Sequence, residues 1–472
     1  MYYPSKQEFV ELAKKGNLIP VYKEIVADME TPVSAFRKIE GEYSFLLESI
    51  EGGEKIARYS FLGTSSKRQA AKPKTLEEVR TILKKYKPIV VPGLPRFHGG
   101  LVGYVGYDVV RQIEPKLLAS DKNPDDLKIP AMLFLLTDTI LVFDHIKRKI
   151  IIISNADVSD NPQKAYLKAC GRIDKLEKKL KKSLPPEKPI KLHISKASKK
   201  MQSNMTQKQY EAVVEKAKAY IRAGDIIQVV PSQRFETAFK GDPFNVYRAL
   251  RMINPSPYMY YLKLGNMQIA GTSPEVMVRL ENGEATVRPI AGTRRRGKDR
   301  GEDQALEREL LASDKERAEH IMLVDLGRND LGRVCDYGSV RVTEEMVIER
   351  YSHVMHIVSN VSGKLKKGKD AVDLLAATFP AGTVSGAPKV RAMEIIDELE
   401  NRKRGIYAGC VGYFGFSGEM DTCITIRTIL FTDKKAYIQV GGGVVADSIP
   451  SQEYQETVNK AKAMFRAIEM GR

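Results

Sequence analysis

Apolar residues recur at helical spacing in the second half of the chain. Between Gln207 and Ala223 they fall on one face of a helix, and Gly224 ends the pattern just before the strand-like run Ile226–Val230. The apolar positions of this helix are Tyr210, Val213, Val214, Ala217, Tyr220 and Ile221. The same spacing predicts further helices over Pro243–Ile253, Asp314–Leu326, Pro388–Leu399 and Pro450–Ile468.

Short runs of β-branched and aromatic residues, separated by Gly and polar turns, predict strands along the whole chain. In the first part they are Ser44–Leu47, Gly100–Val105, Ala131–Thr137, Ile140–Phe143 and Lys149–Ile153. In the second part they are Gln268–Gly271, Glu284–Pro289, Gly409–Phe416, Thr422–Leu430 and Lys435–Gly441. Strand and helix do not alternate regularly, which argues against a parallel doubly wound sheet. The pattern therefore predicts an α+β fold built as a large mixed sandwich.

A lysine-rich stretch divides the chain. It starts near Lys164, ends at Lys200, and contains Pro185, Pro186 and Pro189, which is typical of a helix followed by a linker. We therefore predict a sheet-rich N-terminal domain over residues 1–156, a lysine-rich helix and linker over 157–203, and a second domain over 204–472.

The charge and the cysteines limit the classes of function. The net charge of +17 suggests nucleic acid as a partner, because basic patches bind phosphate. No recognition helix, zinc finger or RNP-like motif accompanies the lysines, so a solvated helix explains them better and we expect no nucleic-acid partner. No run of 18 apolar residues and no signal-like start occurs, and the four cysteines lack CxxC spacing. We expect a cytoplasmic protein without a membrane span.

Two short acidic patterns are candidates for a metal site. Glu316 and Glu319 are three residues apart at the start of a predicted helix, so their carboxylates project from one face. Glu453 and Glu456 repeat this spacing, and Lys460 follows one turn later. If the helices meet, the four carboxylates need a cation, and oxygen ligands favour Mg²⁺. Ser313-x-x-Glu316 is also a capping box, so a purely local role of Glu316 stays open.

Further candidates lie in loops and strands. The run Phe379–Lys389 places Thr383 in a small-residue loop before a helix, where exposed amides bind anions, although a plain loop fits as well. Gly441, Gly442 and Gly443 follow a strand and allow a planar ligand to approach the backbone, and Arg427 offers a carboxylate clamp. In Ser352–His356, His353 and His356 are candidate imidazoles, although structural histidines are commoner.

Taken together, these patterns resemble the chorismate-utilising enzymes, most closely the anthranilate synthase component I family. The resemblance covers nearly the whole chain. Besides the motifs above, it includes Leu46–Ser49, Gly224–Arg234, Asn254–Met259, Gly271–Glu275, Pro289–Thr293 and Asp325–Arg333. It implies a large mixed, mainly antiparallel β-sandwich flanked by helices. It also implies Mg²⁺-dependent conversion of chorismate and ammonia to anthranilate and pyruvate, the first committed step of tryptophan biosynthesis.

The resemblance also assigns roles to single residues. It implies that Glu319 and Glu456 bind Mg²⁺, with Glu316 and Glu453 completing the acidic cluster directly or through water. The implied substrate pocket consists of Thr293, Tyr407, Arg427, Gly441, Gly443 and Lys460. Glu275 matches the acid that protonates the departing ring hydroxyl, and His356, rather than His353, matches the residue of the pyruvate elimination. Thr383 and Gln228 complete this catalytic set.

Two positions distinguish relatives within the family. Enzymes that use water as the nucleophile carry a lysine where this chain has Gln228, which favours ammonia here. Aminodeoxychorismate synthase component I, the alternative, usually has a lysine where this chain has Ala291. That lysine can act as a covalent nucleophile and alanine cannot.

The resemblance further implies feedback inhibition by tryptophan. The implied inhibitor site consists of Glu48, Ser49, Asn254, Pro255, Ser256, Pro257, Tyr258, Met259, Tyr413 and Cys423. An ordinary strand and a rigid turn would explain the same residues. No cysteine stands in a glutaminase elbow, so ammonia must come from solution or from a glutamine amidotransferase subunit. We therefore expect a hetero-oligomer with that subunit.

Overall fold

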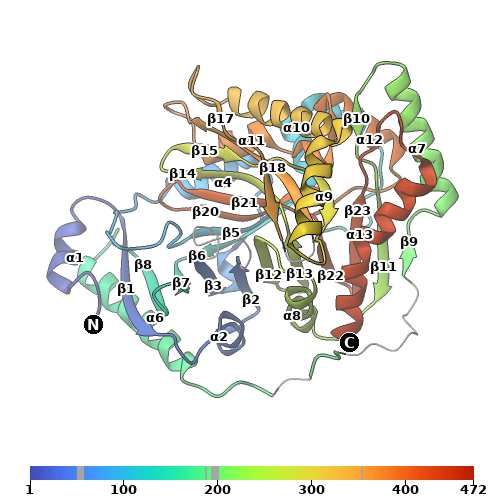
Figure 1. The fold of residues 1–472 in the computed structure, drawn as a ribbon. Coiled ribbons are helices and arrows are strands. Elements are labelled where there is room, and N and C mark those ends of the chain that lie inside the picture. The colour runs from blue at the N-terminus through green and yellow to red at the C-terminus, as the bar shows by residue number, and fades with distance from the viewer. Residues whose placement is uncertain (50–57, 187–188, 193–200, 352–353) are drawn as a thin grey trace.

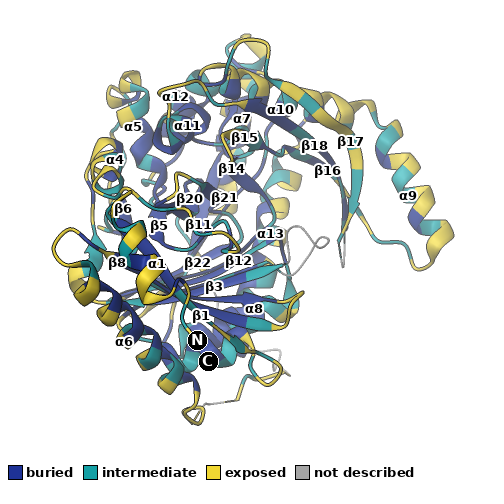
Figure 2. Cartoon of the chain, turned by 90° about the vertical axis from the view of Figure 1, so that its left-hand side faces the viewer, coloured by how far each residue is buried: buried dark blue, intermediate teal, exposed yellow. Residues whose placement is uncertain are grey.

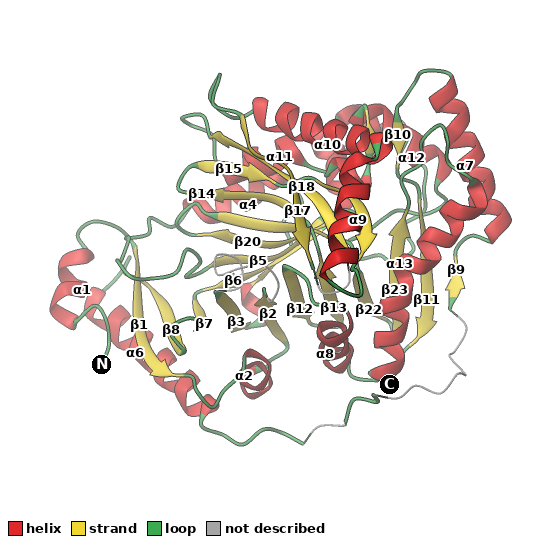
Figure 3. Ribbon diagram, in the orientation of Figure 1, coloured by secondary structure: helices red, strands yellow, loops and turns green. Residues whose placement is uncertain are grey.

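The computed structural model describes residues 1–49, 58–186, 189–192, 201–351 and 354–472. Two large β-sheets pack face to face, and helices cover their outer faces (Figures 1 and 3). All pairings between the named neighbouring strands are antiparallel, as the register of each ladder shows. The predicted α+β sandwich is therefore confirmed.

The first sheet combines strands from both ends of the chain. Its order is β1 (Leu18–Val26), β8 (Lys149–Asp157), β7 (Thr139–Asp144), β3 (Tyr59–Ser65), β2 (Tyr43–Glu48), β12 (Tyr258–Leu264), β13 (Met267–Ser273), β22 (Thr428–Thr432), β23 (Lys435–Gly441), β11 (Ser232–Ala238) and β9 (Gln202–Ser203). The predicted N-terminal and C-terminal segments thus share this sheet, because β2 pairs with β12.

The second sheet is built in the same way. Its order is β16 (Ile290–Arg295), β18 (Val354–Lys364), β15 (Glu284–Val287), β14 (Val276–Glu281), β21 (Met420–Ile424), β20 (Cys410–Gly415), β5 (Gly100–Val105), β6 (Met132–Thr137) and β4 (Ala70–Ala71), and β17 (Arg341–Arg350) pairs with β18. The short strands β10 (Gln228–Val229) and β19 (Gly386–Ala387) pair with each other. The predicted strand Ile226–Val230 is therefore reduced to two residues.

Helices lie on the outer faces of the two sheets. The first sheet is covered by α1 (Lys6–Leu12), α2 (Pro32–Ile39), α6 (Pro162–Leu180), α8 (Pro243–Ile253) and α13 (Pro450–Met470), and the second by α4 (Leu76–Lys84), α10 (Asp314–Gly332) and α11 (Ala371–Thr378). The other helices are α5 (Val110–Ile113), α7 (Gln207–Arg222), α9 (Arg300–Ala312) and α12 (Lys389–Leu399). Helix α9 projects from the body with an exposed outer face (Figure 2).

The lysine-rich helix is confirmed as α6. Its apolar face, with Ala169 and Ile173 fully buried, packs on β8, and its lysines stay mostly exposed. Lys188, Lys196, Lys199 and Lys200 of the predicted linker lie outside the described residues. No helix in the described ranges is both long and apolar enough to cross a membrane.

Two neighbouring strand pairs pass from one sheet to the other at the same place. The chain leaves β13 in the first sheet at Ser273 and enters β14 in the second at Val276. It returns from β21, which ends at Ile424, to β22, which begins at Thr428. The two crossing segments are joined by backbone hydrogen bonds from Ile424 N to Glu275 O (3.0 Å) and from Thr272 N to Arg427 O (3.2 Å).

The crossing corrects one prediction. The sequence predicted a single strand over Thr422–Leu430, but the chain bends between Ile424 and Thr428, and Arg427 has φ of +51°. The apolar pattern continues through the bend because both flanking strands are buried. An arginine gives no sequence signal for a positive φ, which is uncommon for residues other than glycine.

The structure explains why glycine stands at position 271 beside the crossing. A Cβ atom there would lie 2.3 Å from the ring of Tyr260 on the neighbouring strand. We predict that Gly271→Ala lowers the free energy of unfolding by about 1–3 kcal/mol, because the buried ring has to move. Thermal and urea unfolding followed by circular dichroism measures this change.

The matched control is Gly171→Ala on the exposed face of α6, where a Cβ atom meets nothing within 4 Å. This change should stabilise the helix by about 0.5–1 kcal/mol, because alanine suits a helix interior better than glycine. Equal stability of the two variants would contradict the packing argument.

Candidate active site

The crossing segments carry two of the predicted site residues, Glu275 and Arg427. Glu275 is buried between the layers and accepts a hydrogen bond from the Thr383 hydroxyl (3.2 Å). Burial raises the pKa of Glu275 to about 8, although the hydrogen bonds from Thr383 and from the Ile290 amide oppose the shift. The carboxyl is therefore protonated near neutral pH and can donate a proton.

Arg427, the second predicted site residue on the crossing segments, carries a positive charge. Burial lowers the pKa of its guanidinium, while the nearby Glu456 and Tyr407 oppose the shift. Its side chain is half-buried and has no ion pair among the described residues, whereas the fully buried Arg404 pairs with Glu400 at 2.6 Å. A half-buried guanidinium without an ion pair is a strong site for a carboxylate, because its planar fork can donate two charge-assisted hydrogen bonds to the two oxygens.

The three glycines at the end of β23, Gly441 to Gly443, leave room that side chains would fill. A Cβ atom at Gly441 would lie 2.7 Å from the Tyr407 hydroxyl, and one at Gly443 would lie 2.5 Å from Gln228 Nε2. At Gly442 it would lie 3.2 Å from Glu453 Oε2. This backbone therefore passes directly between Tyr407, Gln228 and the acidic helix α13.

The predicted acidic helices α10 and α13 lie close enough for charges on one helix to shift the pKa of glutamates on the other. On α10, Glu319 accepts a hydrogen bond from Gln228 Nε2 (3.3 Å), and burial raises its pKa. On α13, Glu453 accepts a hydrogen bond from the Ser448 hydroxyl (2.7 Å), and burial raises its pKa too. Lys460 of α13 acts on the pKa of Glu319, and Lys315 of α10 on that of Glu453, so the two helix faces are close enough to interact.

The other two glutamates have cationic partners. Glu456 pairs with Lys460 (2.6 Å), whose ammonium also donates to the Gly441 carbonyl (3.1 Å). Glu316 pairs with Arg294 (3.1 Å), and its backbone amide donates to the Ser313 hydroxyl (3.4 Å), so the Ser313 cap is confirmed. Glu316 is therefore held toward the β16 side of the site.

The acidic residues fit a cation in their chemistry. Glu453 Oε2 is buried and has no hydrogen-bond partner, which is costly for a carboxylate oxygen unless a cation or proton is nearby. The carboxylates of Glu319 and Glu453 each have a second carboxylate beside them that raises the pKa further. In the part of the chain that the structure describes, no three acidic, His or Cys residues are already gathered as a metal-ligand group.

His356 and Thr293 lie opposite each other on β18 and β16. The Nδ1 atom of His356 is 3.0 Å from the Thr293 hydroxyl and 3.0 Å from the Gly292 carbonyl. A carbonyl only accepts, so the proton of the neutral ring sits on Nδ1 and Nε2 keeps its lone pair. Burial lowers the pKa of His356, and the nearby Arg427 adds to the effect, which keeps the ring neutral. His353 lies outside the described residues.

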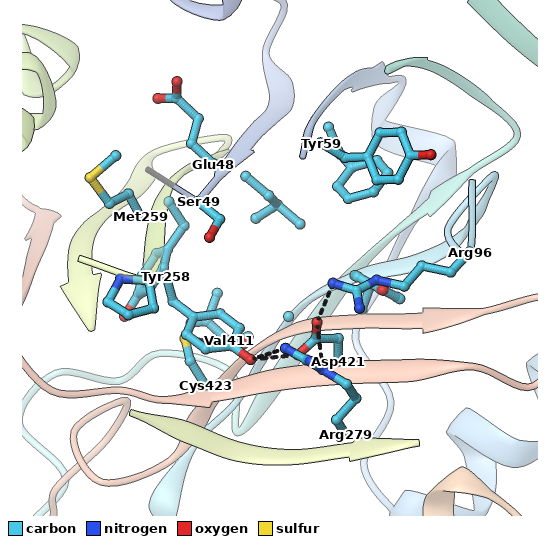
Figure 4. A pocket seen from close by; sticks show the side chains of 16 residues that line it. Glu48, Ser49, Tyr59, Arg96, Tyr258, Met259, Arg279, Val411, Asp421 and Cys423 are labelled. Atoms are coloured by element: carbon cyan, nitrogen blue, oxygen red, sulfur yellow. Dashed lines mark hydrogen bonds and ion pairs between the residues drawn. The ribbon is translucent and has the colours of Figure 1, made fainter. Parts of the chain in front are cut away.

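Most of the predicted inhibitor residues line a separate pocket between the two sheets (Figure 4). Its walls include Glu48, Ser49, Pro257, Tyr258, Met259, Tyr413 and Cys423. Asn254, Pro255 and Ser256 do not line it; they form the turn before Pro257, where the Asn254 amide donates to the Thr272 hydroxyl (3.2 Å). Because that turn holds Pro257 and Tyr258, these residues support the wall from behind.

Glu48 and Ser49 point in different directions. Burial raises the pKa of Glu48, and its carboxylate turns away from the pocket centre (Figure 4) to pair with Arg251 (2.9 Å) and Tyr247. The Ser49 hydroxyl points into the pocket, where it is buried without a hydrogen-bond partner. In this structure Ser49 is therefore the free polar group, and Glu48 is already neutralised.

Sequence analysis missed the charged side of this pocket. Asp421 accepts a hydrogen bond from Tyr258 (2.8 Å) and pairs with Arg96 (3.0 Å) and Arg279 (3.2 Å), as Figure 4 shows. A signal existed only for Asp421, which stands two residues before Cys423 on β21 and therefore shares its face. Arg96 and Arg279 come from distant segments and gave no pattern.

Comparisons with known proteins agree with the geometry. A family model described as chorismate binding enzyme matches residues 42–466. Anthranilate synthase component 1 of Acetivibrio thermocellus is 48% identical and that of Aquifex aeolicus 49%, each over 99% of this chain and 99% and 98% of the relative. The crystal structure of anthranilate synthase component I from Streptococcus pneumoniae TIGR4 has a TM-score of 0.78 and 38% identity, covering 94% of this chain and 99% of that one.

These matches extend over both sheets and both candidate pockets, and they confirm the resemblance drawn from the motifs. The curated relatives and this chain cover each other almost end to end, so the likeness concerns the whole chain rather than one shared segment. The chain belongs to the chorismate-binding enzymes and, within them, to the anthranilate synthase component 1 family.

Proposed function

We propose that the site between α10, α13 and the crossing converts chorismate and ammonia to anthranilate and pyruvate with the help of Mg²⁺. The observation that carries this proposal is the combination of two groups: Glu275, a buried carboxyl that is protonated near neutral pH, and Arg427, a half-buried guanidinium that has no ion pair among the described residues. Chorismate is a dianion with a ring hydroxyl to be expelled, so it needs both groups. The overall activity of an anthranilate synthase component follows from the family.

The residues divide the chemistry between them. Arg427 and Tyr407 bind the enolpyruvyl carboxylate, and Lys460 and the backbone of Gly441 and Gly443 border the same space. Glu275, oriented by Thr383, donates its proton to the departing C4 hydroxyl as ammonia attacks C2. In the elimination of pyruvate, Nε2 of His356 accepts the proton that leaves the ring, because Nδ1 is occupied by the Gly292 carbonyl. Thr293 holds the same imidazole.

Gln228 suits ammonia better than water. Its Nε2 atom donates to Glu319, while its Oε1 atom is buried without a hydrogen-bond partner. An amide oxygen accepts an N–H of ammonia but cannot take a proton from water, as a neutral lysine would. Ammonia already has a free lone pair, so no base is required at this position.

Mg²⁺ would be held by glutamates of α10 and α13, and it would neutralise the ring carboxylate of the substrate. Glu319, Glu453 and Glu456 face the glycine backbone, whereas Glu316 is held by Arg294. We further propose that the pocket between the two sheets binds tryptophan, since the aromatic side chains of Phe61, Tyr258 and Tyr413 in its walls suit an indole. The expected partner is a glutamine amidotransferase subunit, component II, which supplies ammonia in the cytoplasm.

The purified chain should form anthranilate from chorismate, Mg²⁺ and ammonium salt at about pH 8.5, where free ammonia is available. EDTA should abolish the fluorescence increase of anthranilate, and tryptophan should depress it. Parallel measurement of pyruvate identifies the elimination step. If chorismate disappears without anthranilate or pyruvate, the product is an aminodeoxychorismate and the proposal is wrong.

The raised pKa of Glu275 predicts a limb in the pH profile. Its proton is present below about pH 8 and is lost as the pH rises through that value, so kcat/KM expressed per free ammonia should fall above it. Glu275→Gln should lower kcat by about 10²–10⁴-fold and remove this limb, because the amide carries no transferable proton.

Glu419→Gln is the matched control, because burial also raises the pKa of Glu419 but this residue lies near Asn282, outside the site. It should leave rate and profile unchanged. A Glu275→Gln enzyme with wild-type kcat would refute the role as acid.

The four glutamates should contribute unequally to metal binding. Glu319→Gln or Glu453→Gln should weaken Mn²⁺ binding at least about tenfold, since each carboxylate is half-buried and lacks a cationic side-chain partner in the described structure. Glu316→Gln should weaken it less, because Arg294 already pairs with that carboxylate. Electron paramagnetic resonance of free Mn²⁺ reports binding without turnover.

Glu215→Gln on the exposed face of α7 is the control for lost charge and should bind Mn²⁺ like the wild type. A larger loss for Glu316→Gln than for Glu319→Gln would reverse the assignment.

A further inference from the structure

We propose that Tyr260 and Thr428 are positioning residues for Arg427, and that they couple the pocket lined by Tyr260 to the substrate arginine. This inference rests on the proposed function, because it takes chorismate as the ligand of Arg427. Tyr260 and Thr428 both act on the segment that carries Arg427.

The first step is a contact that spans three strands. Tyr260 on β12 stands opposite Gly271 on β13, and Gly271 stands opposite Thr428 on β22. The missing side chain of Gly271 lets the Tyr260 ring lie across β13. Its hydroxyl therefore reaches the Thr428 hydroxyl at 2.6 Å, in a place where both residues are buried. Such a buried bond is well defined, because no water competes for it.

The second step links Thr428 to the crossing. Its hydroxyl donates to the Ile426 carbonyl (2.8 Å), and the Arg427 carbonyl accepts from Thr272 N (3.2 Å). Arg427 sits between these two bonds with φ of +51°, a conformation that persists only when the surroundings impose it. Since its guanidinium has no ion pair among the described residues, the backbone of the crossing determines where it points.

The third step links the same bond to the pocket. The Tyr260 ring lines the pocket beside Met259, and Cys423 of the pocket wall lies on β21, only four residues before Arg427. A ligand that presses on the ring shifts its hydroxyl, and the shift reaches Arg427 through Thr428 and Ile426. A ligand of the pocket that favours one position of this segment changes the affinity of Arg427 for its carboxylate ligand. By linkage, the ligand of Arg427 changes the affinity of the pocket by the same factor.

The test uses Tyr260→Phe, which keeps the ring in the pocket wall and removes only the hydroxyl. We expect KM for chorismate to rise about fivefold, as for the loss of one buried hydrogen bond, with kcat changed less than about twofold. The chain contains no Trp, so the fluorescence of added tryptophan reports its binding directly. In Tyr260→Phe, the affinity for tryptophan alone should change less than twofold. The factor by which chorismate weakens tryptophan binding should fall toward one.

Variants at Thr428 separate positioning from a loss of stability. Thr428→Val removes the hydroxyl at nearly constant shape and should reproduce the effects of Tyr260→Phe. Thr428→Ser keeps the hydroxyl and should restore KM and coupling. Tyr104→Phe is the matched control, because the buried Tyr104 hydroxyl donates to the Pro130 carbonyl (2.6 Å) rather than to the crossing. It should leave KM and coupling at wild-type values.

The inference is overturned if Tyr260→Phe and Thr428→Val keep the wild-type KM and coupling factor. It is also overturned if Thr428→Ser behaves like Thr428→Val, or if Tyr104→Phe has the same effects as Tyr260→Phe. If the wild-type protein forms no anthranilate, the proposed function fails instead. Tryptophan fluorescence titrated with and without chorismate then still decides the coupling, because it needs no turnover.

Discussion

The structure depends on one constraint, the passage of two hydrogen-bonded strand pairs from one sheet to the other at a single place. Strands β13 and β22 pair in the first sheet, and their continuations β14 and β21 pair in the second. The crossing segments bond to each other through Glu275 and Arg427 backbone atoms. Neither segment can shift alone without breaking buried backbone hydrogen bonds, which are costly to leave unpaired.

This arrangement accounts for the unusual charge states of the site. Glu275 lies between the layers, so it loses water and its pKa rises to about 8, while Arg427 is a half-buried charge without a paired acid in the described structure. On the surface, the same side chains would be an ordinary carboxylate and a solvated guanidinium. The fold therefore supplies a proton donor and an anion clamp by burial alone, before any ligand binds.

The sequence predicted local features well and long-range contacts only where a motif identified them. Periodicity gave α7, α8 and α13, and spacing placed Glu316 with Glu319 and Glu453 with Glu456 on helix faces. The resemblance then brought Glu275, His356 and Arg427 into one site. Periodicity failed at Arg427, because a bend between two buried strands keeps the apolar pattern intact. It also could not assign Arg96 and Arg279 to Asp421, since these three residues meet only through sheet topology.

The net charge of +17 does not by itself explain how a dianion is selected. Surface charges are screened over about 8 Å at physiological ionic strength, so the lysines of α6 contribute little to a site on the far side of the sheet. At the site itself, Lys460 is paired with Glu456 and Arg294 with Glu316. Arg427 has no ion pair among the described residues, and hydrogen bonds of the crossing hold its backbone. In the proposed site, recognition of a substrate carboxylate therefore depends on the geometry of the two sheets more than on the overall charge of the protein.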